Sequence, residues 1–245
     1  NLNGSVFFDF LNQNIEIDYQ LKNNSLFLKS PDNISDIKID ALIELKPFNL
    51  KILIVLEESD KDTINSVSNY DCRLVFQKNK GYGDALILGI NEVTTKYFCI
   101  FNADGSFNPK ELITMYKNLT SNKIDFIFAS RYEQDCSSED DTLITYIGNF
   151  IFTKIGNIFF NLKITDILYT FVIGKVESFK NLNMENKDFS FCVELPIKAC
   201  KFGYTLGTSK SNERARIGGR KKVNAFKDGL LILISMFKLF FRVKK

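Results

Sequence analysis

An acidic turn, Phe-Asn-Ala-Asp-Gly at residues 101–105, directly follows one of the apolar runs of the chain. Mg²⁺ and Mn²⁺ prefer oxygen ligands, and a carboxylate at the end of a buried strand can hold such an ion against two phosphate groups. Asp104 is therefore the strongest single candidate for a metal ligand. Asn, Asp and Gly are also common in turns that bind nothing, and that interpretation stays open.

A second candidate site residue, Arg131, follows the apolar run at residues 124–129. Its planar side chain presents five N–H donors and can bind a phosphate through two parallel hydrogen bonds. An ordinary surface ion pair is the alternative.

Positive charge is concentrated near the carboxyl end of the sequence. Residues 210–245 carry a net charge of +9, and the whole chain carries +3, so the first 209 residues carry −6. This distribution favours an anionic partner: phosphate, nucleic acid or a membrane surface. Five basic residues surround a Gly-Gly pair in a loop that could close over a phosphate: Arg214, Arg216, Arg220, Lys221 and Lys222. We expect no nucleic-acid partner, because the predicted site carries Glu57, Glu58 and Asp104.

The final segment, residues 226–245, joins an apolar run to bulky and basic residues. Aromatic and aliphatic side chains flanked by Lys and Arg suit a helix that lies in a membrane interface. The segment is too short and too charged to span a bilayer, and no stretch of the chain reaches ~18 uninterrupted apolar residues. A C-terminal helix packed on the core is the alternative.

The composition excludes several classes of protein. A chain of 245 residues with 45% hydrophobic and 25% charged residues suits one globular domain. It has no histidine, which rules out Ser-His-Asp and Cys-His catalysis and a His-ligated zinc site. Its five cysteines include no C-x-x-C pair, so neither a disulfide framework nor a zinc ribbon fits. A reducing cytoplasm is the simplest location, and no secretory signal is visible.

Short apolar runs alternate with helical patterns along most of the chain. The predicted strands are residues 25–29, 51–56, 73–77, 97–101 and 124–129, and the predicted helices are residues 35–44, 62–68, 84–93, 109–119, 143–161, 176–182, 193–202 and 224 onward. This alternation predicts a mostly parallel sheet with right-handed crossovers. Ligands of such a sheet bind at the carboxyl ends of its strands, where residues 57–60, 102–105 and 130–132 fall. The acidic stretch at residues 133–141 is predicted to be a mobile loop.

Three glycines, Gly81, Gly83 and Gly89, lie at the entry to a predicted helix in KGYGDALILGI. They do not match the dinucleotide-binding pattern G-x-G-x-x-G, because Leu86 stands where the third glycine is required. Either the backbone approaches a ligand closely here, or the glycines form a tight turn.

Taken in order, these segments resemble family-2 glycosyltransferases of the GT-A fold, and within them the polyprenyl-phosphate, dolichyl-phosphate mannose synthase-like branch. The matching segments are LVFQKNKGYGDALILGI, YFCIFNADGSFNPKEL, FASRY, ITDILYTFVIGK, FCVELPIKACKFGY and ERARIGGRKKVNAFKDG. The most specific part is RIGGRKK at residues 216–222, which is similar to the family's R-x-x-G-x-S-K element with Lys221 in place of the serine.

The resemblance implies an α/β GT-A fold with a Rossmann-like, mostly parallel sheet flanked by helices. We expect an N-terminal extension of unclear role at residues 1–24, a glycosyltransferase domain at residues 25–223 and an amphipathic helix at residues 224–245. The resemblance also implies inverting transfer from a GDP- or UDP-linked sugar, with Mg²⁺ or Mn²⁺ bound through a D-x-D motif. Asn102 stands at the first position of that motif, so we expect weaker metal binding rather than none.

The expected site residues follow from the same resemblance. The metal is expected to contact Asn102, Asp104 and Ser106. The nucleotide sugar is expected to contact Pro31, Glu57, Glu58, Lys80, Asn102, Ala103 and Asp104. The acceptor phosphate is expected to contact Arg131, Arg214, Arg216 and Lys222.

The acceptor decides which residues are catalytic. A lipid phosphate is already anionic and needs no strong base, so Arg131 and Arg216 would only position it. A sugar hydroxyl would need a carboxylate to accept its proton, for which Asp166 is the first candidate and Glu194 the second. The structural alternatives are a turn cap at Asp166 and a solvated helix-face carboxylate at Glu194.

We therefore expect a metal-dependent glycosyltransferase, peripherally associated with the membrane at its cytoplasmic face, that acts on a polyprenyl phosphate. Transfer to a sugar hydroxyl during surface polysaccharide or glycolipid assembly is the second hypothesis. A third is a non-catalytic relative that binds nucleotide or anionic lipid, which the replacement by Asn102 supports.

Overall fold

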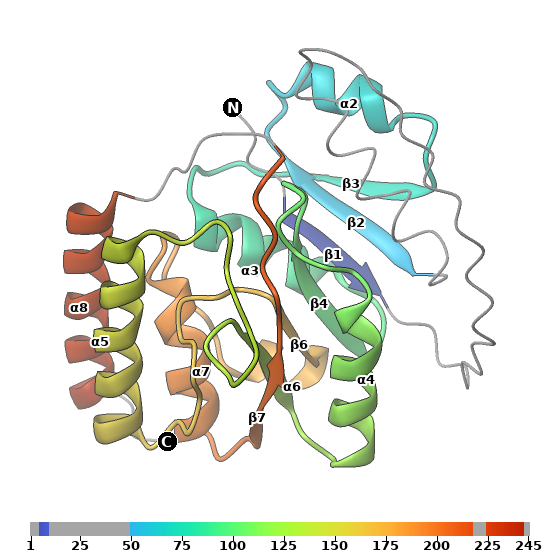
Figure 1. Ribbon diagram of the computed structural model, residues 1–245. Coiled ribbons are helices and arrows are strands. Elements are labelled where there is room, and N and C mark those ends of the chain that lie inside the picture. The colour runs from blue at the N-terminus through green and yellow to red at the C-terminus, as the bar shows by residue number, and fades with distance from the viewer. Residues whose placement is uncertain (1–4, 10–49, 218–223, 243–245) are drawn as a thin grey trace.

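The computed structural model describes residues 5–9, 50–217 and 224–242 of the chain (Figure 1). The strand expected at residues 25–29, the helix expected at residues 35–44, Pro31 and Lys222 lie outside the described residues. Within the described part, helices pack on both faces of a central sheet.

The described residues form one seven-stranded sheet in the order β3-β2-β1-β4-β6-β5-β7. The strands are β1 (Ser5–Asp9), β2 (Lys51–Leu56), β3 (Cys72–Phe76), β4 (Tyr97–Asn102), β5 (Phe126–Ser130), β6 (Val172–Lys175) and β7 (Leu206–Lys210). β4 and β5 are buried along almost their whole length, which explains their continuous apolar sequences.

The direction of the strands differs from the expectation. Five described strands run one way, and β1 and β6 run the opposite way. Because β1 lies between β2 and β4, and β6 between β4 and β5, four of the six neighbouring pairs are antiparallel. The prediction of a mostly parallel sheet was therefore wrong for the described strands, which form a mixed sheet. The carboxyl ends of β2, β4 and β5 nevertheless lie at one edge.

The N-terminal strand has a position that the sequence pattern did not indicate. In β1, Ser5 pairs with Val55 of β2 on one side and with Asn102 of β4 on the other. Residues expected to belong to an extension of unclear role thus contribute a strand inside the sheet.

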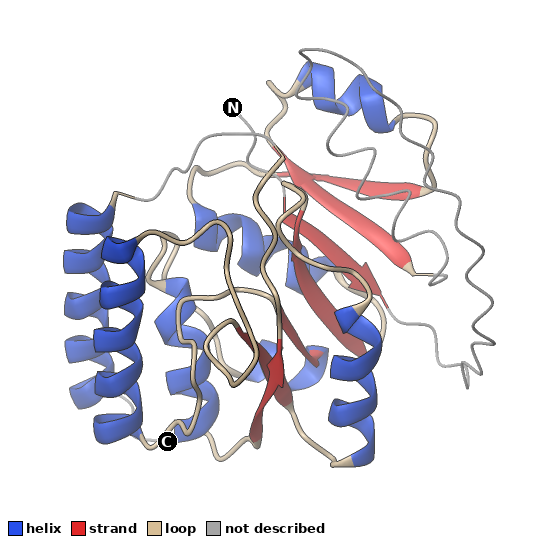
Figure 2. Ribbon diagram, viewed as in Figure 1, coloured by secondary structure: helices blue, strands red, loops and turns tan. Residues whose placement is uncertain are grey.

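The helices match the predicted pattern to within a few residues (Figure 2). They are α2 (Lys61–Val67), α3 (Tyr82–Glu92), α4 (Glu111–Ser121), α5 (Leu143–Phe160), α6 (Val176–Asn181), α7 (Phe191–Lys201) and α8 (Ala225–Arg242). α4 begins after Pro109 because the side chain of Asn108 accepts the backbone N–H of Lys110, at 3.1 Å, and forms a turn there.

Aromatic side chains fill the core on both faces of the sheet. Along β4, Phe98 faces the cluster beneath α3, α6 and α7, whereas Phe101 faces the cluster beneath α4. This alternation follows from the two-residue period of a strand. Phe107 and Phe171 stack at 4.7 Å between ring centroids and fill the α4 side.

Helix α5 is, among the described helices, long and apolar enough to cross a membrane by length and composition. We expected no such segment, because polar residues interrupt every apolar run before ~18 residues. In the structure those interruptions have a role: Asn149 and Thr153 are buried, together with Gly156 and Phe160, in a stripe that faces the domain. α8 packs beside α5 (Figure 1).

Candidate active site

The acidic turn at the carboxyl end of β4 is held in a fixed conformation. Oδ1 of Asp104 accepts hydrogen bonds from the backbone N–H of Ser106, at 3.1 Å, and from its hydroxyl, at 2.7 Å. Gly105 has a φ of +84°, which other residues rarely adopt. The Asp104 side chain keeps 20% of its surface exposed, and its second oxygen, Oδ2, makes no hydrogen bond with Ser106.

A segment of the basic loop lies along this turn. The backbone N–H of Ile217 donates to the carbonyl oxygen of Asp104 at 2.9 Å, and that of Arg214 donates to the carbonyl oxygen of Ser106 at 2.9 Å. The guanidinium of Arg216 reaches Oδ2 of Asp104, with 3.6 Å between Nη1 and Oδ2. The structure thus places a cationic side chain beside the predicted metal ligand.

Arg216 is also bound by Asp140, which sequence analysis did not single out. Its Nε and Nη2 donate to the two carboxylate oxygens of Asp140 at 3.2 and 2.9 Å. The hydrogen bond with Asp140 raises the pKa of Arg216. Asp140 belongs to the acidic stretch that we expected to be mobile. That stretch is tied down, because the backbone N–H of Glu139 donates to the carbonyl oxygen of Glu213 at 3.0 Å.

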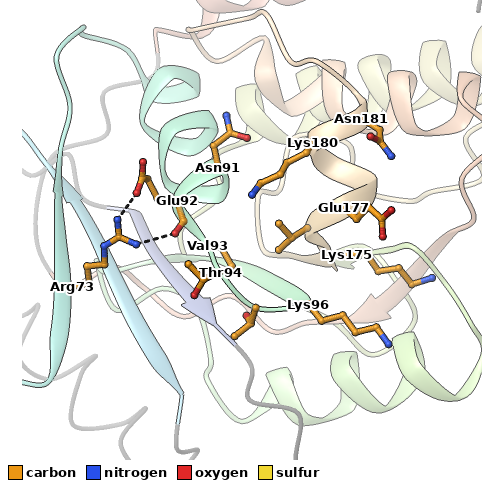
Figure 3. A pocket seen from close by; sticks show the side chains of 12 residues that line it. Arg73, Asn91, Glu92, Val93, Thr94, Lys96, Lys175, Glu177, Lys180 and Asn181 are labelled. Atoms are coloured by element: carbon orange, nitrogen blue, oxygen red, sulfur yellow. Dashed lines mark hydrogen bonds and ion pairs between the residues drawn. The ribbon is translucent and has the colours of Figure 1, made fainter.

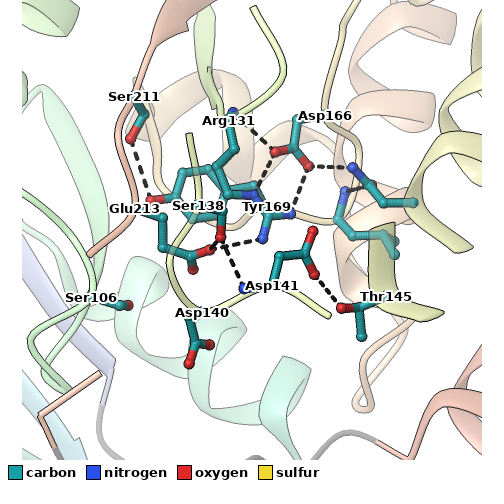
Figure 4. A network of polar contacts seen from close by, with 12 residues as sticks. Ser106, Arg131, Ser138, Asp140, Asp141, Thr145, Asp166, Tyr169, Ser211 and Glu213 are labelled. Atoms are coloured by element: carbon teal, nitrogen blue, oxygen red, sulfur yellow. Dashed lines mark hydrogen bonds and ion pairs between the residues drawn. The ribbon is translucent and has the colours of Figure 1, made fainter. Parts of the chain in front are cut away.

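A buried ion-pair network surrounds Arg131 (Figure 4). Its Nε and Nη2 donate to the two oxygens of Asp166 at 2.7 and 3.0 Å, and its Nη1 donates to Glu213 at 3.0 Å. The Asp166 side chain is fully buried, and that of Arg131 is 11% exposed. The side-chain amide of Asn149 in α5 also donates to Oδ1 of Asp166, at 2.8 Å. Burial acts to lower the pKa of Arg131, but the two carboxylates outweigh burial and raise it.

Two aromatic rings enclose the Arg131 guanidinium. Its Cζ lies 4.5 Å from the ring centroid of Tyr169 and 5.1 Å from that of Tyr132, distances typical of cation–π contact. Burial raises the pKa of both phenols. Both therefore remain protonated near neutral pH and cannot serve as bases.

The network has a consequence for the predicted catalytic residues. Both oxygens of Asp166 are occupied by Arg131 and Asn149, and three of the Arg131 nitrogens point at carboxylates. In this arrangement Arg131 and Asp166 bind other side chains of the protein and stabilise the structure around the site. Their roles as phosphate ligand and base stay predictions.

Glu194 lies outside this network, and its role as a second candidate base stays a prediction. It is 1% exposed, and its carboxylate accepts the backbone N–H groups of Glu185, at 2.9 Å, and Asn186, at 2.7 Å. Lys198, one turn along α7, lies 2.8 Å from it. The structural alternative, a solvated helix-face carboxylate, was wrong, because the buried carboxylate of Glu194 holds the loop before α7.

That same loop explains the glycines before α3. A Cβ atom at Gly83 would lie 2.3 Å from the carbonyl oxygen of Asn186, and one at Gly81 would lie 2.2 Å from that of Lys187. The backbone that approaches these two glycines closely therefore belongs to the loop before α7 of the same chain.

Replacing Gly83 with alanine is expected to lower the free energy of unfolding by about 1 to 3 kcal/mol, because the added methyl group overlaps backbone atoms. The matched control is Gly148→Ala in α5, where no atom lies within 4 Å of the added Cβ. That control should raise stability by up to ~1 kcal/mol, since alanine favours a helix over glycine. Urea unfolding followed by circular dichroism measures both, and equal effects would contradict this account.

The other predicted donor-site residues lie at the same edge or next to it. Glu57 and Glu58 follow β2, where the backbone N–H of Glu57 donates to Asp60 at 3.2 Å. Lys80 is exposed in the connection from β3 to α3. Ala103 is buried in the core below the acidic turn, so its side chain does not line an open site.

The first position of the motif contacts a tyrosine. The side chain of Asn102 lies near the Tyr82 hydroxyl, which is 2.6 Å from the hydroxyl oxygen of Thr170. Burial raises the pKa of Tyr82, so the phenol remains protonated. Ser106 is 1% exposed and directs its hydroxyl to Asp104, an arrangement that positions the carboxylate. Its role as a direct metal ligand stays a prediction.

The donor set fits a metal that is shared with substrate phosphates. No group of three or more His, Cys, Asp or Glu side chains able to hold a metal occurs in the part of the chain that the structure describes. Mg²⁺ and related ions are commonly held by one or two protein oxygens plus phosphates and water. The carboxylate of Asp104 and the amide of Asn102 suit such an ion.

Five residues of the site were not foreseen: Asp140, Asn149, Glu213, Tyr82 and Tyr169. Glu213 lies 82 residues from Arg131 along the chain, and Asp140 lies 76 residues from Arg216. No local pattern links such pairs. For Asn149, its place inside an otherwise apolar helix is a signal that a buried partner exists.

A separate pocket of about 810 Å³ lies at the opposite edge of the sheet, by the start of β4 and the end of β6 (Figure 3). Two of its charged side chains pair with each other, and a third pairs with an aspartate outside the lining. Arg73 donates to the carboxylate and carbonyl of Glu92, and Lys175 lies 2.7 Å from Asp125. None of the predicted site residues lines this pocket.

The order of the sheet, the helices on its two faces and the acidic turn at its carboxyl edge define a GT-A-type domain. The sequence model of glycosyl transferase family 2 matches residues 37–182, more than half of the chain. The protein therefore belongs to glycosyl transferase family 2, whose members transfer sugars from nucleotide-linked donors.

Two groups of known proteins are similar to this chain. Uncharacterized glycosyltransferases of Mycobacterium bovis and Mycobacterium tuberculosis are 21% identical over 199 residues, which cover 81% of this chain and 89% of the relatives. Glucosyl-3-phosphoglycerate synthase from Mycobacterium tuberculosis in complex with UDP shares the fold, with a TM-score of 0.60 at 10% identity over 79% of this chain and 70% of that one. Its complex with Mn²⁺, UDP-glucose and phosphoglyceric acid aligns with a TM-score of 0.58 at 10% identity, over 79% and 69% of the two chains.

Proposed function

We propose that the protein is a metal-dependent, inverting glycosyltransferase that moves a sugar from a UDP- or GDP-linked donor to a polyprenyl phosphate at the cytoplasmic face of a membrane. The donor half of this proposal is supported by Asp104 at the carboxyl end of β4, by the family membership and by the UDP-glucose and Mn²⁺ in the structural neighbour.

The assignment of a phosphate acceptor rests on one observation: both carboxylates predicted as bases already have hydrogen-bond and ion-pair partners within the protein. Asp166 accepts from Arg131 and Asn149, and Glu194 accepts from two backbone N–H groups and pairs with Lys198. A sugar hydroxyl must lose a proton to such a group, whereas a phosphate is already ionised at neutral pH. The occupied carboxylates therefore favour a phosphate acceptor.

A bound Mg²⁺ or Mn²⁺ would neutralise charge on the departing nucleoside diphosphate. Asp104 and Asn102 would supply its protein oxygens. Arg216 lies beside Asp104 and can turn from Asp140 toward an anionic acceptor, which would orient the acceptor oxygen toward the sugar. Arg131 would not contact the acceptor itself. Its ion pair with Glu213 would fix the loop that leads to Arg216.

The acceptor is tested by supplying radiolabelled UDP-glucose or GDP-mannose with Mn²⁺ to the full chain. Polyprenyl phosphate and the matching free polyprenol are compared as acceptors. The proposal predicts a lipid-soluble labelled product with the phosphate and none with the alcohol. Transfer to phosphoglyceric acid or to a glycan, without transfer to polyprenyl phosphate, would overturn the acceptor assignment and favour the hydroxyl-acceptor hypothesis.

A further inference from the structure

The largest unexplained feature of the described surface is its distribution of apolar side chains. Seventeen large apolar side chains are exposed among the described residues, and fifteen of them lie on α5 and α8. The other two are Phe76 and Ile217. An exposed apolar surface concentrated in this way is typical of an interaction site.

Each of the two helices has one buried and one exposed apolar face. In α8, Ile232, Ser235, Met236 and Leu239 are buried, at the three- and four-residue spacing of a single helix face. Phe226, Leu230, Leu233, Phe237 and Phe240 repeat with the same spacing on another face, and all are exposed. Both kinds of residue also occur in α5, where the buried stripe contains Asn149 and Thr153.

The exposed faces join into one surface. α5 and α8 lie side by side (Figure 1), and the rings of Phe159 and Phe240, both exposed, meet at 6.0 Å between centroids. Near the start of α8, a Cβ at Gly229 would lie 3.9 Å from the ring of Phe152, which precedes Phe159 in α5. The helices therefore run in the same direction, and we call the exposed faces together the α5–α8 surface.

The charges on these helices identify the kind of partner. α5 contains Lys154 and no acidic residue. α8 contains Lys227, Lys238 and Arg242 against one acid, Asp228, which accepts the backbone N–H of Asn224 at 2.7 Å. The three basic residues of α8 share one edge of the helix, because they are spaced eleven and four residues apart.

We propose that the α5–α8 surface docks on the leaflet of an anionic lipid bilayer, with α5 contributing as much as α8. Aromatic and aliphatic side chains would enter the acyl boundary while the basic edge faces lipid phosphates. A second copy of the chain fits less well, because pairing two such surfaces brings four basic residues of each copy together with one acid each.

The surface also adjoins the candidate active site. The exposed ring of Tyr146 on α5 meets that of Tyr132 at 5.2 Å between centroids, and Asn149 on the same helix binds Asp166. A lipid phosphate in the docked leaflet would thus lie next to the Arg131 network. This step rests on the proposed acceptor, whereas docking itself does not.

The test is flotation of the full chain with vesicles of phosphatidylcholine, with or without phosphatidylglycerol. Wild-type protein should bind the anionic vesicles, and Phe150→Glu in α5 or Phe237→Glu in α8 should each weaken binding by about tenfold or more, the loss expected for one buried aromatic side chain. Phe76→Glu, on β3, is the matched control and should leave binding unchanged. Replacing Lys227, Lys238 or Arg242 with glutamine should cost about fivefold each on anionic vesicles only.

Three results would overturn the proposal. They are no binding of the wild type to either vesicle, binding that Phe150→Glu leaves intact, or a dimer in sedimentation velocity that Phe150→Glu dissociates without any vesicle binding. Thermal unfolding followed by circular dichroism checks that each variant is folded. No donor or acceptor is present in flotation, so its failure is separate from a failure of donor binding, which calorimetry measures.

Discussion

Replacing Asp166 with alanine is expected to lower the free energy of unfolding by about 3 to 5 kcal/mol, because it leaves a buried guanidinium without its main counter-charge. Asp166 is fully buried and accepts hydrogen bonds from the backbone and side chain of Arg131 and from Asn149. Only Glu213 would remain to pair with Arg131. Urea unfolding at neutral pH measures the change.

The matched control for this prediction is Glu92→Ala. Glu92 pairs with Arg73 at the surface, where the two side chains are 40% and 54% exposed. Removal of an exposed pair should cost no more than about 1 kcal/mol. If Asp166→Ala lowered the free energy of unfolding no more than this control does, the ion-pair network around Arg131 would not stabilise the domain as described.

Replacing Asp104 with alanine is expected to lower metal-dependent sugar transfer by about 100-fold to 1,000-fold, the loss typical of one charge-stabilising group in an active site. Its loss also leaves the buried N–H and hydroxyl of Ser106 without their acceptor, so the free energy of unfolding should fall by about 1 to 3 kcal/mol. Initial rates with saturating Mn²⁺ measure the effect.

A second variant distinguishes the effect of the Asp104 carboxylate from the effect of the hydrogen bonds that position it. Ser106→Ala keeps Asp104 but removes the 2.7 Å hydrogen bond from the hydroxyl. It should lower the rate by about tenfold, which corresponds to one ordinary hydrogen bond. Wild-type turnover in Asp104→Ala would show that the acidic turn is only a turn.

The positions of the central strands could be predicted because their sequences are dictated by burial. β4 and β5 are continuous apolar runs, and the residues after them, Asp104 and Arg131, lie at the predicted edge of the sheet. β6 and β7 were not among the predicted strands, and neither the insertion of β1 nor the reversed direction of β6 could be predicted. A short apolar strand has the same pattern in either direction, and pairing depends on strands far away in sequence.

Side-chain partners were harder to predict than positions. Arg131 and Asp166 were both named from the sequence, but as separate parts of a reaction rather than as a buried pair 35 residues apart. Glu194 was named as a second candidate base, with a solvated helix-face carboxylate as its structural alternative, because a charged residue is seldom fully buried without a partner. Its partners are two backbone N–H groups and Lys198, and a helical pattern does not reveal them.

The most direct test of the central claim is titration calorimetry of UDP-glucose and GDP-mannose, with and without Mn²⁺, on the wild type and on Asp104→Ala. The account predicts that one of these donors binds the wild type only when Mn²⁺ is present, and that Asp104→Ala abolishes this binding. Binding that is unaffected by the loss of Asp104, or no binding of any nucleotide sugar, would contradict the donor site described for the carboxyl end of β4.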